Sequence, residues 1–214
     1  MFIQFNNEAE WRAFRKGKIG GTTASALIGE NPYKTNVDAY QIISGIKEEE
    51  DISNKPYVIK GKEAEELILK LWSLDHPEFD VIHFANAVYI DDKRPYLYCS
   101  PDGLAVNRET GEKWTLEIKT AEVLRTLSKE KWTKDNIPTN YLVQTLVETH
   151  CANETVGTIL IAELKHSDDY TTRITRVVVK NDYLTTIDEL LEVIDDFWNN
   201  NIQKKKEPNL IVKL

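Results

Sequence analysis

CSPDGLAVNRETGEKWTLEIKT, residues 99–120, contains two strand-like segments on either side of a tight turn. Residues 107–111, Asn-Arg-Glu-Thr-Gly, are typical turn formers, and the flanking segments alternate apolar and polar residues. Pro101 precedes Asp102 in the first segment, and a proline there predicts a bulge or an interrupted ladder that re-aims the acid. The stretch therefore predicts a hairpin of two strands, about residues 96–106 and 113–120.

The second strand of this hairpin carries charged side chains on one face. Residues two apart on a strand share a face, so Glu117 and Lys119 project together while Ile118 points to the other side. The short turn places Asp102 opposite Glu117. Two neighbouring carboxylates repel unless a proton or a cation lies between them, and Mg²⁺ prefers such oxygen ligands. A lysine beside them can orient or deprotonate an attacking water and offset phosphate charge.

A simpler interpretation of the same residues stays open. Asp102 is also a common turn residue, and Glu117 with Lys119 is also an ordinary ion pair worth at most about 1 kcal/mol on an exposed strand. Pro-Asp followed by Glu-x-Lys is a loose pattern. The hairpin alone does not decide between a catalytic site and a surface ion pair.

Glu65 is a third acid with a distinctive position. Its neighbours at i+3, i+4 and i+7 on a helix expected from Gly61 are apolar, so its carboxylate lies beside the buried face. It either contributes to a metal site or stabilises the helix N-terminus by about 0.3–1 kcal/mol. The expected buried stripe of this helix consists of Ala64, Leu67, Ile68, Leu71 and Trp72.

The order of expected elements indicates an α/β (α+β) fold with a central mixed sheet flanked by helices. We expect one domain over residues 1–214, with an exposed connector at 46–57 and a C-terminal tail at 203–214 that either packs between subunits or stays loose. Thr22 or Thr23 is the expected cap of the second helix. The other expected helices are 8–16, 35–45, 121–134, 140–151 and 183–202, and the other expected strands are 81–90, 156–164 and 171–179.

Composition excludes several classes of protein. The 214 residues are 41% hydrophobic and 29% charged, which fits a folded domain rather than a disordered chain. No basic N-terminal region precedes an apolar stretch, so we expect a cytoplasmic protein that does not enter a membrane. Cys99 and Cys151 lack metal-ligand spacing and are expected as small buried residues in a reducing compartment.

The net charge of −8 weighs mildly against a protein whose whole surface binds nucleic acid. Basic residues are nevertheless clustered, at positions 12–18 and again at 125–134, while acids gather at 48–51 and 188–196. Solvated faces of ordinary helices explain such clusters equally well. The charge pattern leaves the partner open.

Five separated blocks together resemble the phage-type exonuclease family of phage lambda exonuclease and the YqaJ viral recombinases, within the PD-(D/E)xK nucleases. The resemblance covers about residues 11–164, and the five blocks are more specific together than the hairpin motif alone. The blocks are Trp11-x-x-x-Arg15 with Ile19-Gly20-Gly21-Thr22 and Asn31-Pro32-Tyr33, Gly61-x-x-x-Glu65, Cys99-Ser100-Pro101-Asp102-Gly103-Leu104, Leu116-Glu117-Ile118-Lys119, and Tyr141-x-x-Gln144.

This resemblance implies a restriction-endonuclease-like core and a specific set of roles. Asp102, Glu117 and the carbonyl oxygen of Ile118 would bind Mg²⁺, with Mn²⁺ as a substitute, and Glu65 would contribute to a second ion. Lys119 would activate the nucleophile, which makes Glu65, Asp102, Glu117 and Lys119 the expected catalytic set. Arg15, Thr22, Ser100 and Gln144 would bind DNA phosphates, and Asp92 corresponds to an accessory acid.

The resemblance also implies an activity and partners. The expected protein is a 5′→3′ exonuclease on ends of linear double-stranded DNA, from a phage or a prophage in a bacterial host. It would form a homo-oligomer, such as a trimeric ring with basic residues facing its channel, and would work with a single-strand annealing protein. The alternatives are an endonuclease of the same fold and a noncatalytic DNA-binding or assembly protein.

Overall fold

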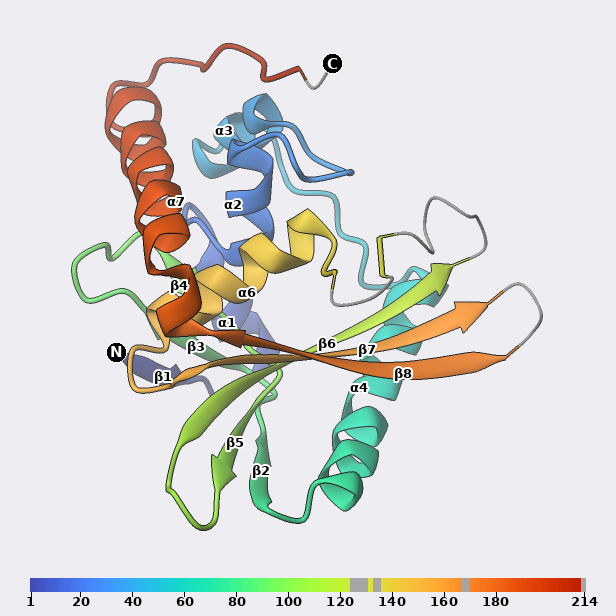
Figure 1. Cartoon of the computed structure of the whole chain (residues 1–214). Coiled ribbons are helices and arrows are strands. Elements are labelled where there is room, and N and C mark those ends of the chain that lie inside the picture. Colours follow the sequence, from blue (N-terminus) through green and yellow to red (C-terminus); the bar gives the residue numbers. More distant parts are fainter. Residues whose placement is uncertain (124–130, 133–135, 167–169, 213–214) are drawn as a thin grey trace.

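The structure, a computed structural model, describes residues 1–123, 131–132, 136–166 and 170–212. Its centre is a five-stranded sheet with the strand order β2-β5-β6-β7-β8 (Figure 1). β6 and β7 are parallel and the other neighbours are antiparallel, so the sheet is mixed, as expected. The strands are β2 (Phe79–His83), β5 (Gly103–Asn107), β6 (Lys113–Val123), β7 (Gly157–His166) and β8 (Thr171–Val179).

The β5–β6 hairpin forms where the turn residues predict it. The side-chain oxygen of Asn107 accepts hydrogen bonds from the backbone N–H groups of Glu109 (2.9 Å) and Thr110 (3.0 Å). Gly111 closes the turn with φ 72°, a left-handed conformation that favours glycine. The hairpin register pairs Gly103 with Leu116. This register brings the residue before β5, Asp102, next to Glu117.

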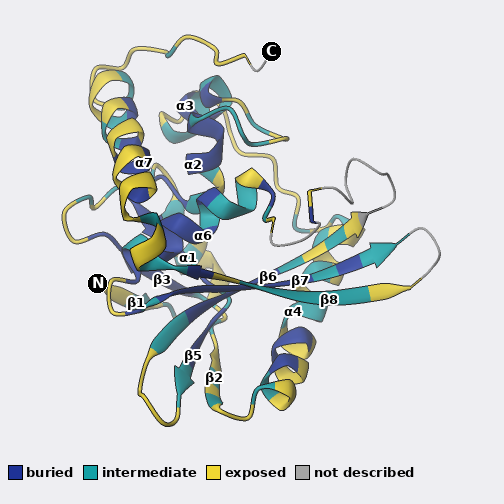
Figure 2. Ribbon diagram, viewed as in Figure 1, coloured by how far each residue is buried: buried dark blue, intermediate teal, exposed yellow. Residues whose placement is uncertain are grey.

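Helices cover both faces of the sheet. On one face α4 (Pro56–Asp75) packs Ile68, Leu69 and Trp72 against Leu116 and Ile118 of β6. The opposite face carries α6 (Thr139–Cys151), which lies in the connection between the parallel strands β6 and β7. Buried residues line both contacts (Figure 2). The expected flanking of the sheet by helices is confirmed.

Further helices pack on α6, on its side of the sheet (Figure 1). They enclose the largest apolar core of the molecule together with the inward face of α6. These helices are α2 (Gly21–Leu27), α3 (Asn36–Ile43) and α7 (Leu184–Phe197), with one turn before α7 at Lys180–Tyr183 (η1) and one after it at Trp198–Ile202 (η2). Within the described ranges, no helix is both long enough and apolar enough to cross a membrane.

A second, smaller sheet has the order β1-β3-β4 and was not expected from the sequence. Its strands are β1 (Phe2–Gln4), β3 (Ala87–Ile90) and β4 (Tyr98–Cys99). The single strands expected at 81–90 and 96–106 are therefore wrong, because each of these segments leaves one sheet and enters the other. Pro101 lies at the second crossing, where its missing N–H interrupts the ladder.

Some helix boundaries differ from the expected ones. α1 (Glu8–Arg15) and α3 are confirmed, and Thr35 caps α3 with its side chain. The expected cap at Thr22 or Thr23 is wrong, because α2 already begins at Gly21 and has no side-chain cap. α4 begins at Pro56 rather than at Gly61, since proline is favourable in the first turn of a helix. The connector therefore ends before residue 56.

The buried stripes of two helices also differ from the expected ones. In α4, Leu67 and Leu71 are 60% and 45% exposed, and Leu69 is buried in their place. For α7, helical spacing predicts an inward face of Leu184, Ile187, Leu191, Ile194 and Trp198. Leu184 is 50% exposed, while Leu190 belongs to the core. Helical spacing gave the correct period in both helices but placed the edge of the apolar face one position away.

The segment after the hairpin is only partly described. β6 continues through residues 121–123, so the helix expected at 121–134 is wrong at its start. Residues 131–132 form a turn. The remainder of that expected helix, with its basic positions 125, 129 and 134, lies outside the described residues.

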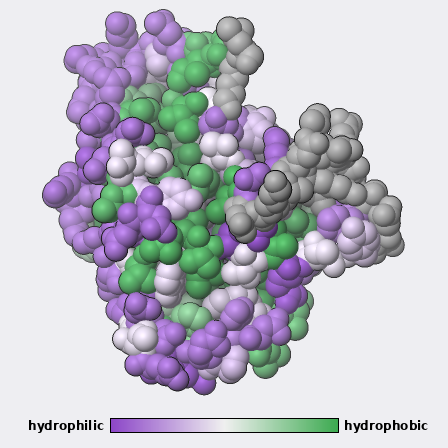
Figure 3. Space-filling model, in the orientation of Figure 1, coloured by the Kyte–Doolittle hydropathy of each residue, from purple (hydrophilic) through white to green (hydrophobic). Residues whose placement is uncertain are grey.

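The C-terminal tail packs against its own chain as far as Ile211. The Asn36 side chain donates to the carbonyl oxygen of Asn209 (2.7 Å) and accepts from the N–H of Ile211 (3.0 Å). Ile211 also fills the space beside Gly29, where an added Cβ would lie 2.9 Å from its Cγ2 atom. Leu210 and Val212 remain more than half exposed. Figure 3 shows apolar residues interspersed with polar ones on this face of the molecule. The tail is thus neither loose throughout nor fully buried.

Candidate active site

Glu117 and Lys119 lie on the face of β6 that α6 covers, while Ile118 between them packs in the core on the α4 side. Glu117 is buried, with 2% of its surface exposed. The Lys119 ammonium group donates to Glu117 Oε1, so the two side chains form an ion pair. The alternation expected for this strand is confirmed, and the pair is enclosed rather than exposed.

Asp102 is held beside this pair by its backbone and its carboxylate. Its N–H donates to the carbonyl oxygen of Leu116 (2.9 Å), and its Oδ2 atom accepts from the N–H of Ile118 (2.6 Å). Burial, followed by the charges of Glu117 and Glu65, raises the pKa of Asp102 well above its usual range. The structure therefore brings Asp102, Glu117 and Lys119 together, and it places Glu65 near enough to act on Asp102.

Glu65 reaches the site from α4, on the inward-facing position that its spacing predicts. Its Oε1 atom lies 2.9 Å from Nε2 of His83, the last residue of β2. Glu66, the next residue, points outward and pairs with Lys70. His83 is a neighbour that the sequence did not reveal, because the pairing of β2 with β5 is needed to bring it to Glu65.

Lys119 remains charged in this setting. Burial by itself lowers the pKa of a lysine, but the charges of Glu117 and Asp102 outweigh that effect and raise the pKa of Lys119. The Lys119 Nζ atom also lies 5.4 Å from the centre of the Tyr141 ring, at the start of α6. The side chain is consequently a hydrogen-bond donor and a positive charge at neutral pH.

Gln144 and Glu148 complete the polar face of α6. Gln144 Nε2 donates to Glu117 Oε1 (2.6 Å) and to Glu148 Oε1 (3.1 Å). Glu148 is 1% exposed, and burial and the neighbouring Glu117 raise its pKa well above the usual range. Glu148 was missed from the sequence, although its spacing of four residues from Gln144 puts both on one helix face.

Arg15 lies at the end of α1 in an aromatic setting. Its guanidinium carbon lies 4.1 Å from the centre of the Trp11 ring, and its Nε donates to the Tyr98 hydroxyl (2.8 Å). Trp11 Nε1 in turn donates to the Ser100 hydroxyl (2.9 Å), which donates to the carbonyl oxygen of Ala87 (2.6 Å). These contacts bring Arg15 and Ser100 into one network two residues from Asp102.

The paired glycines before α2 fit against this network. A Cβ atom at Gly20 would lie 2.8 Å from the Tyr98 hydroxyl oxygen, and one at Gly21 would lie 2.8 Å from Cγ of Gln144. Both distances are too short for any side chain. Close packing therefore requires glycine at both positions, and the next residue, Thr22, has an exposed side chain.

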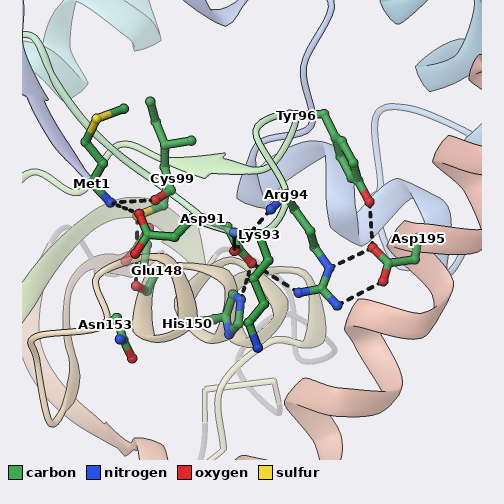
Figure 4. Close-up of polar contacts among 12 residues, drawn as sticks. Met1, Asp91, Lys93, Arg94, Tyr96, Cys99, Glu148, His150, Asn153 and Asp195 are labelled. Atoms are coloured by element: carbon green, nitrogen blue, oxygen red, sulfur yellow. Dashed lines mark hydrogen bonds and ion pairs between the residues drawn. The ribbon is translucent and has the colours of Figure 1, made fainter.

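Asp92 lies apart from these acids. It is exposed and pairs with the N-terminal amino group of Met1 (3.0 Å). The neighbouring residue, Asp91, is buried instead. It contacts His150 and Arg94, and Arg94 in turn forms hydrogen bonds to Asp195 on α7 (Figure 4). The structure gives Asp92 no contact with Asp102 or Glu117 and uses Asp91 to join three elements.

The metal site that the hairpin suggests has few protein ligands. The described residues contain no group of three or more His, Cys, Asp or Glu side chains placed to hold a metal ion. The expected set is smaller, with the carboxylates of Asp102 and Glu117 and one backbone carbonyl, and Mg²⁺ commonly uses one or two carboxylates. Glu117 Oε2 is buried and has no hydrogen-bond partner among the described residues. The donor set fits one hard divalent cation.

Comparisons with known proteins identify similar folds. The chain is similar in structure to an alkaline exonuclease, LHK-Exo, from Laribacter hongkongensis, with a TM-score of 0.58 and 16% identity over 92% of this chain and 96% of that chain. The structure of LHK-Exo in complex with dAMP gives 0.56 and 16% over 92% and 98%. No curated protein is significantly similar in sequence. The expected restriction-endonuclease-like core is confirmed.

The family is established by sequence. The model of the YqaJ-like viral recombinase domain matches residues 10–155, a range that contains every block named above from Arg15 to Gln144. Asp102, Glu117, Lys119 and Gln144, which the fold brings into contact or close to one another, all fall within it. The chain belongs to the YqaJ-like viral recombinase family.

Proposed function

We propose that the chain is a metal-dependent exonuclease that degrades linear double-stranded DNA in the 5′→3′ direction. Family membership and fold make it a deoxyribonuclease of the phage recombination type. The observation that carries the finer proposal is the enclosed group of two acids and one lysine, Asp102, Glu117 and Lys119, on adjoining strands. An ordinary surface ion pair has no need of a second, partly buried acid with a raised pKa.

In this proposal Asp102, Glu117 and the carbonyl oxygen of Ile118 hold Mg²⁺ or Mn²⁺, and Glu65 contributes to a second ion. When bound, the cation supplies Lewis-acid polarisation of the scissile phosphate and a more acidic water. Asp102 is oriented by the N–H of Ile118, and Glu117 by Lys119 and Gln144. These bonds hold both carboxylates in place before any ligand arrives.

Lys119 has a role of its own in the proposed reaction. Because its pKa is raised, it is protonated and donates to the attacking water or to a phosphate oxygen as negative charge develops. Its present acceptor, Glu117 Oε1, keeps the ammonium group inside the site. The charge of Lys119 is thus positioned in advance of the reaction.

The proposed phosphate contacts are Arg15, Thr22, Ser100 and Gln144. Arg15 donates through Nε to Tyr98, and within the described part of the chain its two terminal nitrogens remain available for a phosphate. Ser100 already donates its only hydroxyl hydrogen to Ala87, and Gln144 donates to two carboxylates. Arg15 and Thr22 therefore contact the phosphate first, and the other two must exchange an acceptor to join them.

The proposed partners are the ends of double-stranded DNA, other copies of this chain in a homo-oligomer such as a trimeric ring, and a single-strand annealing protein. Asp92 stays a proposed accessory acid, although its exposed position beside Met1 gives it no contact with the site. The net charge of −8 is compatible with DNA binding, since only the potential near the bound phosphates matters.

Digestion of matched DNA substrates tests the proposal. The purified protein is incubated with a linear duplex and a covalently closed circle, with Mg²⁺ or with a chelator, and the linear duplex is labelled at one 5′ or one 3′ end. We expect immediate release of the 5′ label from linear DNA, slow release of the 3′ label, and an intact circle. Cleavage of the circle would indicate an endonuclease, and binding without cleavage a noncatalytic protein; either result contradicts the proposal.

A further inference from the structure

Glu148 is the one acid of the site that the proposed chemistry does not use. It lies on the inward face of α6 among the core residues Val147 and Cys151, and only 1% of its surface is exposed. A buried carboxyl group costs stability unless other groups offset its burial. The position of Glu148 therefore requires an explanation beyond packing.

The hydrogen bonds of Gln144 connect Glu148 to Glu117. A side-chain amide nitrogen carries two hydrogens, and Gln144 Nε2 lies within hydrogen-bond distance of Glu117 Oε1 (2.6 Å) and Glu148 Oε1 (3.1 Å). With both carboxylates as acceptors, the amide has only one favourable orientation. Glu148 and Glu117 thus favour the same orientation of the Gln144 amide, with its nitrogen toward both carboxylates.

The unused oxygens support this interpretation. Among the described residues, Glu117 Oε2 and Glu148 Oε2 are buried and have no hydrogen-bond partner. Lys119 and Gln144 both bind the other oxygen of Glu117, Oε1. Fixing Oε1 from two sides leaves Oε2 as the oxygen of Glu117 that Lys119 and Gln144 do not bind, on a carboxylate that Glu148 also contacts directly.

We propose that Glu148 is a positioning residue that orients the Gln144 amide and, through it, presents Glu117 Oε2 to the divalent cation. This inference rests on the proposed function, because it assigns Glu117 to the cation. Hydrogen-bond partners behind a metal ligand commonly change metal affinity or activity about 10–100-fold when they are removed. Glu148 acts through an acceptor oxygen, and not by binding the cation itself.

Two substitutions at position 148 separate this role from the alternatives. Glu148→Gln retains an acceptor oxygen for Gln144, whereas Glu148→Leu fills the same space without one. Mn²⁺ affinity is measured by calorimetry without DNA, and folding is checked by thermal unfolding. We expect Glu148→Leu to weaken Mn²⁺ binding about 10–100-fold and Glu148→Gln to stay within about threefold of the unmodified chain.

A double-mutant cycle tests whether the effect passes through Gln144. If it does, Glu148→Leu has little further effect on Mn²⁺ affinity in a chain that already carries Gln144→Leu. The matched controls are Glu192→Gln and Glu192→Leu, on the exposed face of α7, which leave Mn²⁺ affinity unchanged.

Several results would overturn the inference. Equal losses of Mn²⁺ affinity in Glu148→Gln and Glu148→Leu would make Glu148 a direct ligand. Unchanged affinity in both variants would make it a packing residue only. Additive effects of Glu148→Leu and Gln144→Leu would show that Glu148 does not act through the Gln144 amide. Because Mn²⁺ binding is measured without DNA, failure of the digestion experiment would overturn the proposed function and leave this test standing.

Discussion

Arg15 is held by two aromatic side chains in a way that lysine cannot reproduce. The planar guanidinium group stacks on Trp11 and donates through Nε to Tyr98, and its terminal nitrogens have no hydrogen-bond partner among the described residues. We predict that Arg15→Lys reduces the preference for a 5′-phosphate over a 5′-hydroxyl end about 10-fold or more. The measurement is kcat/KM on linear duplexes that differ only in that group.

The same change at Arg12 provides the control for this prediction. Arg12 lies on the exposed side of α1 and pairs with Glu8 (2.7 Å), so Arg12→Lys should change the preference by less than about twofold. Equal effects of the two substitutions would show that α1 contributes only general positive charge.

Asp102 gives the protein a specific dependence of stability on pH. Its folded-state pKa is raised, so the folded chain keeps a proton that the unfolded chain releases above about pH 3.9. The stability from that proton is present at low pH and is lost as the pH rises toward the folded-state pKa. In metal-free buffer we predict that Asp102→Asn stabilises the protein more at pH 8 than at pH 5, measured by urea unfolding.

Asp195 is the matched control, because its pKa is shifted the other way. The hydrogen bond from Arg94 lowers the pKa of Asp195, so its stabilisation is complete above about pH 3.9 and is lost only at lower pH. Asp195→Asn should therefore cost the same free energy of unfolding at pH 5 and pH 8. A pH-independent effect of Asp102→Asn would contradict the raised pKa.

Residue spacing predicted the shared face of Glu117 and Lys119 and the inward position of Glu65, because strand and helix periods are local properties. It did not reveal Glu148 or His83. Their contacts with Gln144 and Glu65 depend on where α6 and β2 lie relative to other elements. The available signal for Glu148 was its spacing, because an acid four residues after Gln144 lies on the same helix face.

The contact between α2 and α6 depends on a glycine. An alanine Cβ at position 21 would lie 2.8 Å from Cγ and 3.1 Å from Cα of Gln144, so one helix must move. We predict that Gly21→Ala lowers the free energy of unfolding by about 1–3 kcal/mol, the usual cost of overpacking. Urea unfolding measures this change.

Gly61→Ala is the matched control within α4. The added Cβ would lie at an ordinary contact distance, 3.7 Å, from Oγ1 of Thr120. Replacing glycine inside a helix by alanine should therefore stabilise the protein by about 0.5–1 kcal/mol. Stabilisation by both substitutions would show that α2 and α6 are not closely packed at Gly21.

At the scale of elements, the sequence predicted the hairpin turn, α3, α6 and the strands β7 and β8 close to their observed bounds. Local turn and cap chemistry is sufficient for these elements. The chain passes from one sheet to the other after His83 and again after Cys99. The sequence did not predict these crossings because strand-like residues lie on both sides of each one. Only the pairing partners distinguish them, and those are distant in sequence.

At the scale of the molecule, charge is acidic overall while several described cations are already paired with acids, such as Lys62 with Glu8 and Lys34 with Glu49. We therefore expect the proposed DNA binding to depend on few phosphate contacts. For two to four contacts, we predict that the affinity of Asp102→Asn for linear duplex falls about 10- to 150-fold between 50 and 200 mM salt. An affinity indifferent to salt would contradict contacts between the site and phosphates.

The central claim is that Asp102, Glu117 and Lys119 form a metal-dependent nuclease site. The most direct measurement is single-turnover release of nucleotides from a linear duplex by the unmodified chain, Asp102→Asn and Lys119→Met, each shown to be folded by circular dichroism. We predict release with Mg²⁺ that stops on chelation and falls at least about 100-fold in both variants. Full activity in either folded variant, or activity indifferent to the chelator, would contradict the claim.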